Sequence, residues 1–249
     1  MGEVIAFVSG KGGTGKTSVC AGVAVALASR GESVLCVDCD VGLTNLDISL
    51  GMSDVAALSF LDVCRGEYPL SQATAHPQIP SVRFLTAPVT CSAEQIDEMA
   101  FSAMISAARR EFDYVLLDAP AGTDAGFRLA VSGADRCVLV TAADPASIRD
   151  AGRTGQVLEL MGKRNVKLVV NRIQPTMVAA MALTVDDVMD RAGLPLLGIV
   201  PEDPNVTFAA VFGKPVEKYS RKTGAALAYG RIARRIQGMP VRIPVKKFK

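Results

Sequence analysis

A glycine-rich segment near the N-terminus has the residue types and spacing of a phosphate-binding loop. The pattern G-x-x-x-x-G-K-[ST] is met by Gly10, Gly15, Lys16 and Thr17. Glycines allow backbone N–H groups to turn inward around phosphate oxygens. The lysine of such a loop reaches the β- and γ-phosphates of a nucleotide, and the hydroxyl that follows it ligates Mg²⁺. We therefore predict nucleotide-binding residues at Gly10, Lys11, Gly12, Gly13, Thr14, Gly15, Lys16, Thr17 and Ser18.

The segments on either side of this loop have the character that the motif requires. Residues 3–8 are typical of a buried strand, and residues 18–30 are typical of an alanine-rich helix. Such a helix directs its positive dipole end at the bound anion. A glycine-rich turn that binds nothing is the alternative, and the strand and helix together argue against it.

Acidic residues stand at the ends of two further predicted strands. Asp38 ends the segment 33–38 and Asp40 follows it, while Asp118 ends the segment 113–118. Carboxylates at strand ends beside a phosphate loop can hold Mg²⁺ directly or through its waters. Phosphoryl transfer needs charge compensation and an oriented water, which these residues can supply. The alternative is that they only cap strands and helices.

A candidate site for a nucleotide base lies further along the chain. Asn171 and Arg172 follow one predicted strand, and Pro201, Glu202 and Asp203 follow the next. An asparagine side chain offers the donor and acceptor pair that an adenine edge needs. Ordinary turn chemistry explains the prolines of the second segment equally well.

Short apolar segments alternate with helical patterns along the whole chain. This alternation implies a parallel sheet covered on both faces, with ligand at the carboxyl ends of the strands. The expected fold class is α/β, a doubly wound, mostly parallel sheet of the P-loop NTPase type with helices on both faces. Capping boxes are expected at Ser92 with Gln95 and at Thr184 with Asp187. The other predicted strands span residues 82–87, 136–141, 166–171 and 196–200, and the predicted helices span residues 93–110, 145–161, 185–192 and 225–237.

Composition limits the classes to which this chain can belong. Its 249 residues are 49% hydrophobic and contain no tryptophan, which suits one large α/β domain with an aliphatic core. No apolar run approaches the roughly 18 residues that a membrane span needs. The N-terminus lacks the pattern of a signal peptide, so we expect a cytoplasmic protein.

The cysteines do not have the pattern of a metal or redox site. Cys36 and Cys39 lie three apart on a predicted strand, so their side chains should point to opposite faces. The other four cysteines have no ligand-like spacing, and buried structural thiols are expected. His76 is the only histidine, which argues against a histidine-based triad or zinc site.

The net charge of +2 conceals an asymmetric distribution. Ten basic residues and no acidic ones follow Glu217, which leaves 17 of the 27 basic residues, against all 25 acidic ones, for the rest of the chain. A basic end of this kind is suited to an anionic partner.

Lys11, at the tip of the loop, is one lysine more than the motif requires. It is poorly placed for the phosphates of its own loop and would suit those of a neighbouring subunit, with an ordinary surface lysine as the alternative. The segment 11–17 resembles the deviant Walker A loop of the MinD/ParA family of ATPases. The resemblance implies that Lys11 crosses between the subunits of an ATP-bound homodimer.

Further motifs extend this resemblance over residues 4–238 and favour the MinD branch of the family. Residues 40–47 resemble its switch I, which implies that Asp40 orients the attacking water and that Asp38 assists the metal. Residues 118–122 resemble its switch II, which implies that Asp118 lies in the Mg²⁺ shell and the Gly122 N–H near the γ-phosphate. The family also uses Asn171 and the loop after Pro201 for adenine. The implied catalytic residues are Lys11, Lys16 and Asp40, and the implied metal residues are Thr17, Asp38 and Asp118.

The C-terminal segment departs from the family pattern. MinD proteins usually end in an amphipathic membrane helix, but Pro240 and Pro244 prevent a continuous helix here. We expect an ATPase domain over residues 1–238 and a basic, proline-containing tail over residues 239–249. The tail pattern suggests an extended strand-like segment, which can bind anionic lipid through its lysines or remain solvated.

The resemblance implies a switch ATPase that hydrolyses ATP to ADP and phosphate with Mg²⁺. It would dimerise with ATP and cycle on and off a surface to position the cell-division site, with peripheral attachment at the inner face of the cell membrane. Division-inhibitor and ATPase-activating proteins are the expected partners. The alternatives are a DNA-associated partition ATPase of the ParA type, although nucleic acid is the less favoured partner, and a flagellar-placement or metal-insertion ATPase on the same fold.

Overall fold

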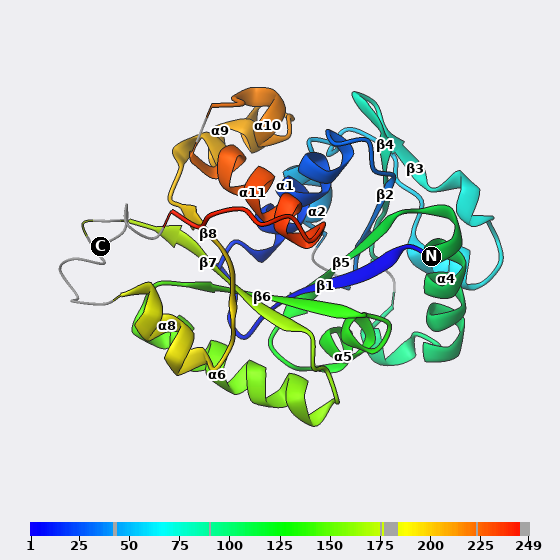
Figure 1. The fold of residues 1–249 in the computed structure, drawn as a ribbon. Helices are drawn as coiled ribbons and strands as arrows, with labels where there is room; N and C mark the ends of the chain where they lie inside the picture. Colours follow the sequence, from blue (N-terminus) through cyan, green and yellow to red (C-terminus); the bar gives the residue numbers. More distant parts are fainter. Residues whose placement is uncertain (42–43, 90, 175, 177–183, 223, 245–249) are drawn as a thin grey trace.

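Strands of buried apolar residues build the centre of the structure. The computed structural model describes the chain except residues 42–43, 90, 175, 177–183, 223 and 245–249. Eight described strands form one sheet in the order β3-β4-β2-β5-β1-β6-β7-β8 (Figure 1). The strands are β1 (Glu3–Ser9), β2 (Val34–Asp38), β3 (Thr74–His76), β4 (Ile79–Leu85), β5 (Tyr114–Ala121), β6 (Arg136–Ala142), β7 (Val166–Ile173) and β8 (Leu196–Pro201).

Among the described strands, only the β3–β4 pair at one edge is antiparallel, and the other neighbours are parallel. The predicted α/β class with a mostly parallel sheet is therefore confirmed. Short 3₁₀ turns lie at η1 (Leu70–Gln72) and η2 (Ala93–Gln95). The described helices are α1 (Lys16–Ala28), α2 (Leu46–Leu50), α3 (Phe60–Cys64), α4 (Glu98–Glu111), α5 (Ala125–Ser132), α6 (Pro145–Leu160), α8 (Val185–Ala192), α9 (Pro204–Val211), α10 (Val216–Tyr219) and α11 (Gly224–Ile236).

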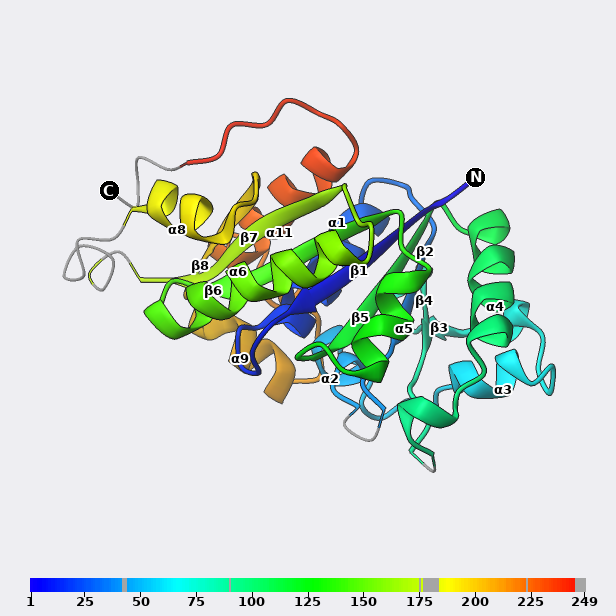
Figure 2. The same ribbon diagram turned by 90° about the horizontal axis from the view of Figure 1, so that it is seen from below.

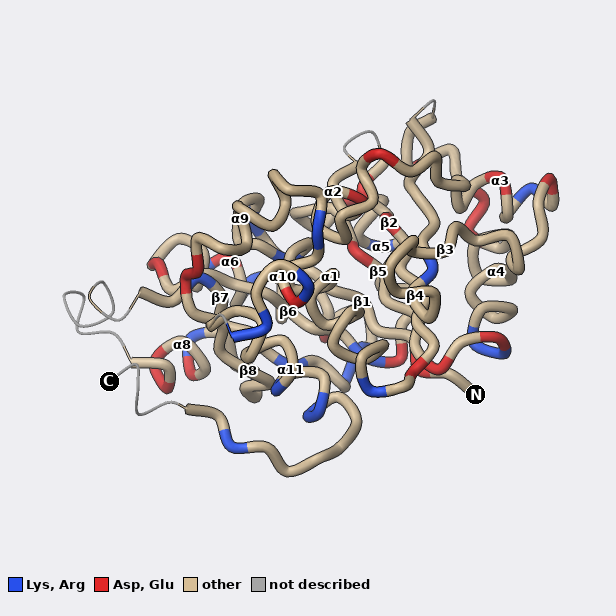
Figure 3. The backbone as a smooth tube through the Cα atoms, turned by 90° about the horizontal axis from the view of Figure 1, so that it is seen from above, with Lys and Arg blue, Asp and Glu red and all other residues tan. Residues whose placement is uncertain are grey.

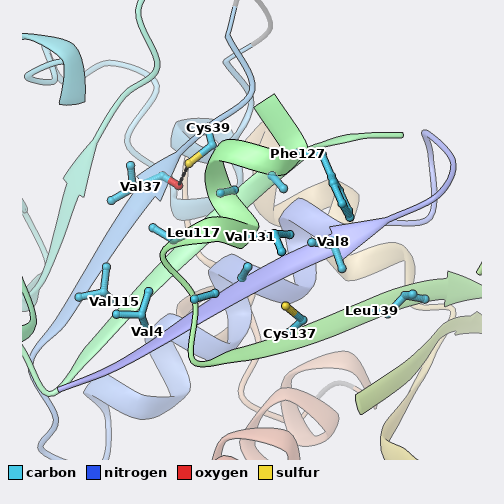
Figure 4. Close-up of a cluster of buried hydrophobic side chains, with 14 of the residues drawn as sticks. Val4, Val8, Val37, Cys39, Val115, Leu117, Phe127, Val131, Cys137 and Leu139 are labelled. Carbon is cyan, nitrogen blue, oxygen red and sulfur yellow. Dashed lines mark hydrogen bonds between the residues drawn. The ribbon is translucent and has the colours of Figure 1, made fainter. Parts of the chain in front are cut away.

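Helices cover both faces of the sheet, as Figures 1 and 2 show. Alternation along β1 divides the core in two. Val4 and Val8 pack under α4, α5 and α6, whereas Ile5 and Phe7 pack under α1 and α11. Figure 4 shows the first cluster, in which Phe127 of α5 lies over the neighbouring strands. Burial on both faces explains why these strands are continuous apolar runs.

The cysteines behave as predicted from strand geometry. Cys36 belongs to the core cluster beneath α1 and Cys39 to the cluster on the opposite face of the sheet. All six cysteines have free thiols, and four of them are buried.

One predicted helix is divided in the structure. The Ser92–Gln95 capping box is present, but it heads the short turn η2 and not a helix over residues 93–110. The chain is extended at Ile96, and α4 begins only at Glu98, where Asp97 accepts hydrogen bonds from two backbone N–H groups. A second N-cap therefore interrupts the helical pattern. The Thr184–Asp187 capping box does head its predicted helix, α8.

Residues 239–244 belong to no described helix or strand. The Arg235 guanidinium donates a hydrogen bond to the Val241 carbonyl at 2.8 Å, and Ile243 packs against the core. The last five residues, with Lys246, Lys247 and Lys249, lie outside the described residues. Among the described helices, none combines the length and apolar character needed to cross a bilayer.

Helices α1 and α11 pack closely because Gly22 of α1 has no side chain, and this contact can be tested. A Cβ on Gly22 would lie 2.1 Å from a ring carbon of the buried Tyr229, whereas one on Gly230 would meet nothing within 4 Å. We expect Gly22→Ala to lower the free energy of unfolding by about 1–3 kcal/mol through overpacking. Gly230→Ala, the matched control, should raise it by up to about 1 kcal/mol because alanine favours helix. Chemical denaturation measures both, and similar effects at the two positions would contradict the close packing.

Candidate functional site

The phosphate loop connects β1 to α1 at the carboxyl edge of the sheet. Gly15 is the N-cap of α1, and its φ of 80° lies in the left-handed region that favours glycine. Gly10 has no room for a side chain, because a Cβ there would lie 2.4 Å from Thr154 Oγ1 of α6. The loop is therefore held between α6 and the start of α1, with the first N–H groups of α1 facing the predicted phosphate position.

A buried ion pair lies at the start of α1. Lys16 Nζ is 2.7 Å from Asp118 Oδ1 at the end of β5, and both side chains are almost fully buried. The same nitrogen lies 3.4 Å from Thr17 Oγ1. Burial alone would lower the pKa of Lys16, but the Asp118 carboxylate outweighs it and the net shift is upward. The lysine is therefore fully charged at the centre of the loop.

Asp38 organises the segment that follows β2. It stands beside Asp118 in the register of β2 and β5. Its carboxylate accepts backbone N–H groups of Asp40, Asn45 and Leu46 at 2.9, 3.2 and 3.2 Å. Burial, with the nearby Asp118 charge, raises the pKa of Asp38 to about 7, although these N–H groups oppose the rise. The structure thus gives Asp38 a loop-holding role, which corresponds to the capping role that the sequence analysis named as the alternative for this residue.

Asp40 lies close enough to the Lys16–Asp118 ion pair for both charges to affect its pKa. It is half-buried, and burial raises its pKa. The charge of Lys16 opposes this rise, and that of Asp118 adds to it. The predicted water-orienting residue is thus brought beside the predicted metal and phosphate residues.

Gly122 lies where β5 leaves the sheet, with a φ of 92°. Its N–H donates a hydrogen bond to the Ser9 carbonyl at 3.0 Å. The N–H that the family resemblance assigns to the γ-phosphate is therefore engaged by the start of the phosphate loop in this structure.

The predicted base residues meet around a cavity of about 210 Å³ beside the loop. Asn171, Arg172, Pro201, Glu202 and Asp203 all line it. The sequence analysis missed further lining residues from α9 and α11, because no local motif marks contacts between such distant segments. These are Val206, Thr207 and Tyr229.

Two of these side chains also fasten the phosphate loop. The Asn171 amide donates a hydrogen bond to the Thr14 carbonyl at 2.8 Å. Arg172 donates to the Gly13 carbonyl at 3.2 Å and forms a two-point ion pair with Glu202 at 2.8 and 3.3 Å. Its φ of 55° makes Arg172 the only non-glycine residue with positive φ in the described part of the chain. A conformation of this kind costs free energy and needs support from its surroundings, which these bonds supply.

Asp203 has a different role from its neighbours. It is the N-cap of α9, where its carboxylate accepts the Asn205 N–H, and it also accepts the Ala225 N–H at the start of α11. It shapes the cavity by joining the two helices.

Lys11 is exposed at the mouth of a second cavity of about 240 Å³, which the Arg172–Glu202 pair also lines. Burial raises the pKa of Asp144, but hydrogen bonds from Ser147 and the charge of Lys11 outweigh it and lower that pKa. Lys11 has no ion-pair partner within 4 Å among the described residues, so its ammonium group is free to reach outward.

The site fits a phosphate group and a magnesium ion chemically. Thr14 Oγ1 is buried without a hydrogen-bond partner in the described part of the chain, and Gly12 and Gly13 leave open space around the loop. Thr17, Asp38 and Asp118 offer hard oxygen donors, which Mg²⁺ prefers. No group of three or more His, Cys, Asp or Glu side chains with metal-site spacing occurs among the described residues. Mg²⁺ usually takes one or two carboxylates together with phosphate oxygens and water, and Asp38 and Asp118 offer two carboxylates here.

The buried ion pair makes the protein without nucleotide sensitive to substitution. Asp118→Asn leaves the Lys16 ammonium group buried and unpaired, so we expect the free energy of unfolding to fall by about 3–5 kcal/mol. The control is Asp150→Asn, which removes the exposed pair with Arg153 at 3.9 Å and should cost less than about 1 kcal/mol. Chemical denaturation without nucleotide measures both. Equal losses of unfolding free energy in the two variants would contradict the larger contribution expected of the buried pair.

Comparisons with known proteins agree with this geometry. Residues 5–216 match the family described as the CobQ/CobB/MinD/ParA nucleotide binding domain. The septum site-determining protein MinD of Bacillus subtilis is 36% identical, over 98% of this chain and 92% of its own length.

Two solved structures are similar over almost the whole chain. A MinC:MinD cell division protein complex from Aquifex aeolicus aligns with a TM-score of 0.89 at 36% identity, over 97% of this chain and 98% of its own. MinD of Pyrococcus horikoshii, solved with Mg-ADP, aligns with a TM-score of 0.83 at 30% identity, over 95% and 96%. With its glycine-rich loop, buried lysine–carboxylate pair and adjacent cavity at the carboxyl edge of a parallel sheet, the chain belongs to the MinD/ParA family of nucleotide-binding proteins.

Proposed function

We propose that this protein is a Mg²⁺-dependent ATPase that dimerises with ATP, hydrolyses it to ADP and phosphate, and thereby positions the cell-division site. The observation that carries the proposal is the buried Lys16–Asp118 pair, with Asp40 beside it and Lys11 free at the loop tip. The names of the similar proteins support the division role, because they are septum site-determining and cell-division proteins.

The residues at the phosphate loop divide the work of binding and hydrolysis. The phosphates would compete with Asp118 for the Lys16 ammonium group. Thr17, Asp38 and Asp118 would hold Mg²⁺, which would supply compensation for the charge that develops on the phosphate oxygens. Asp40 accepts a hydrogen bond from the attacking water and orients it. Release of the Gly122 N–H from Ser9 would let it face the γ-phosphate.

In this proposal, the same residues hold the phosphate loop and bind the adenine base. Asn171 and Arg172 hold the loop through the Thr14 and Gly13 carbonyls, and Glu202 fixes Arg172. The adenine occupies the cavity that these residues line with Pro201 and Asp203. We assign residues 1–238 to this ATPase domain and residues 239–249 to the tail.

The exposed face of the site supports the proposed dimer, and the similar proteins support its partners. Lys11 reaches the phosphates of the second subunit, because its own loop turns it outward and no described side chain engages it. The Aquifex relative was solved in complex with MinC, which supports a division-inhibitor protein as a partner of this chain as well. An ATPase-activating protein is the second partner proposed.

The switch can be tested through the oligomeric state. Asp40→Ala should slow hydrolysis by about 10²-fold or more because the water loses its orienting carboxylate. Size-exclusion chromatography of this variant should show a dimer with ATP and a monomer with ADP. Adding Lys11→Ala should abolish the dimer and leave ATP affinity close to that of Asp40→Ala alone, whereas adding Lys16→Ala should abolish ATP binding.

The contrast between the two lysines is the control, since both changes remove one positive charge from the same loop. Nucleotide binding is measured separately by fluorescence titration. An ATP dimer that survives Lys11→Ala would contradict the crossing role of this lysine.

The basic tail supplies a second test, of attachment to an anionic membrane surface. Each lysine near such a surface contributes about 1 kcal/mol, and two tails on one dimer add through avidity. Removal of residues 239–249 should abolish ATP-dependent sedimentation with anionic vesicles, and replacing Lys246, Lys247 and Lys249 by glutamate should do the same in the full-length chain. Unchanged sedimentation would refute the lipid role, and loss of duplex DNA binding in its place would favour the partition alternative.

A further inference from the structure

Helix α2 is anchored by a side chain at each of its ends. At its start, the Asp38 carboxylate accepts the backbone N–H groups of Asn45 and Leu46, each at 3.2 Å. At its end, Nε2 of the His76 ring lies 2.8 Å from the Leu50 carbonyl oxygen. The proposed function uses the first of these anchors and gives no role to the second.

Both nitrogens of the buried His76 ring are engaged by the backbone. The Leu50 carbonyl can only accept a hydrogen bond, so Nε2 carries the proton. The Gln78 N–H donates to Nδ1 at 3.0 Å, so Nδ1 is unprotonated. Burial lowers the pKa of His76, and the charge of Lys218 adds to this effect, although the bond to Leu50 opposes it. The ring is therefore neutral at pH 7, as both bonds require.

The carbonyl that His76 holds is one that helix geometry leaves without a partner. The last carbonyl groups of a helix find no N–H group within the helix, and α2 has only five residues. Leu46, Leu50 and Met52 bury one side of this segment in the core beneath α1. Apolar burial has no preferred direction, so it does not fix how a short helix is rotated or where it lies along its axis. The two polar anchors supply that restraint.

The two anchors stand on connected strands of the sheet. Asp38 ends β2, and His76 ends β3, whose antiparallel neighbour β4 pairs with β2 in parallel. Figures 1 and 3 show α2 beside these strands. The Asp38 carboxylate also accepts the Asp40 N–H at 2.9 Å. A displacement of α2 would therefore be transmitted to Asp40 through the carboxylate that both segments share.

We propose that His76 is a positioning residue for the hydrolytic step, which holds the end of α2 and so keeps Asp38 and Asp40 in place. His76 lines neither the base cavity nor the cavity beside Lys11, so it acts through α2. This role rests on the proposed function, because it assumes that Asp40 orients the attacking water. It gives the only histidine of the chain a part in the reaction without any contact with the reacting groups.

Two substitutions of similar shape separate the two ring nitrogens. His76→Gln keeps an N–H donor near the position of Nε2 and loses the acceptor at Nδ1. His76→Asn keeps an acceptor near the position of Nδ1 and is too short to reach the Leu50 carbonyl. The matched control is Thr74→Val on the same strand. It removes the hydrogen bond that Thr74 Oγ1 accepts from the Leu58 N–H at 3.0 Å, and it leaves α2 untouched.

Steady-state ATP hydrolysis by the full-length chain with Mg²⁺ is the first measurement. His76→Asn should lower kcat by about 10- to 100-fold, because a small displacement of a positioning group has an effect of this size. The KM for ATP should stay unchanged, since the phosphate loop and the base cavity keep their residues. His76→Gln should restore kcat, and Thr74→Val should retain it. Circular dichroism checks that each variant is folded.

The second measurement is amide hydrogen exchange with Mg-ADP bound, which does not depend on hydrolysis. In His76→Asn the Asn45 and Leu46 amides should exchange about 2- to 12-fold faster, the range that one hydrogen bond contributes. His76→Gln and Thr74→Val should leave them unchanged. Because His76 is the only histidine, ¹⁵N-labelled histidine gives one imidazole signal, which should show a protonated Nε2 and an unprotonated Nδ1.

The outcomes distinguish this role from the proposed function. A wild-type chain that does not hydrolyse ATP would refute the proposed ATPase, and the role of His76 with it. An active wild-type chain whose kcat is unchanged in His76→Asn would overturn the role of His76 alone. An equal loss in Thr74→Val, no recovery in His76→Gln, unchanged exchange at Asn45 and Leu46, or a proton on Nδ1 would also overturn it.

Discussion

The arrangement of the site depends on one constraint, a lysine ammonium group that must be held in a nearly dry position before any phosphate arrives. Asp118 Oδ1 lies 2.7 Å from Lys16 Nζ and holds this ammonium group. Asp118 can reach it only because its strand, β5, lies next to β1, which leads into the phosphate loop. The same pairing brings Asp38 into register with Asp118 and keeps Asp40 near both. A buried charge is stable only with a partner, so the order of the strands and the ion pair depend on each other at this point of the sheet.

Much of the fold follows from local sequence. Strands such as β6 are continuous apolar runs, and an alternating βα pattern has few arrangements in space. The phosphate loop is equally local, since all its residues lie within one turn and the start of one helix. The 93–110 segment shows where local reasoning fails, because Asp97 was a second capping residue inside an otherwise regular helical pattern.

The contacts of the site are less accessible to sequence reasoning. Asn171 and Arg172 were predicted to contact a base, but the sequence did not predict their bonds to the Thr14 and Gly13 carbonyls, which join segments about 157 residues apart. No spacing in the sequence encodes such a pair. The same holds for Glu217, which lies where α10 packs against α1 and α11 and whose buried carboxyl oxygens accept no hydrogen bond from another described residue. A polar residue whose environment is formed by distant segments of the chain can be recognised only from the three-dimensional structure.

Helix α1 also sets a distance within the molecule. Every side chain from Val19 to Leu27 is buried, so the helix has no polar face and lies enclosed by the sheet, α2 and α11. Thirteen residues span about 20 Å. The phosphate loop lies at the first end of this helix and the cavity lined by Ala26, Ser29 and Arg30 at the other, so the packing of a single helix sets the distance between them.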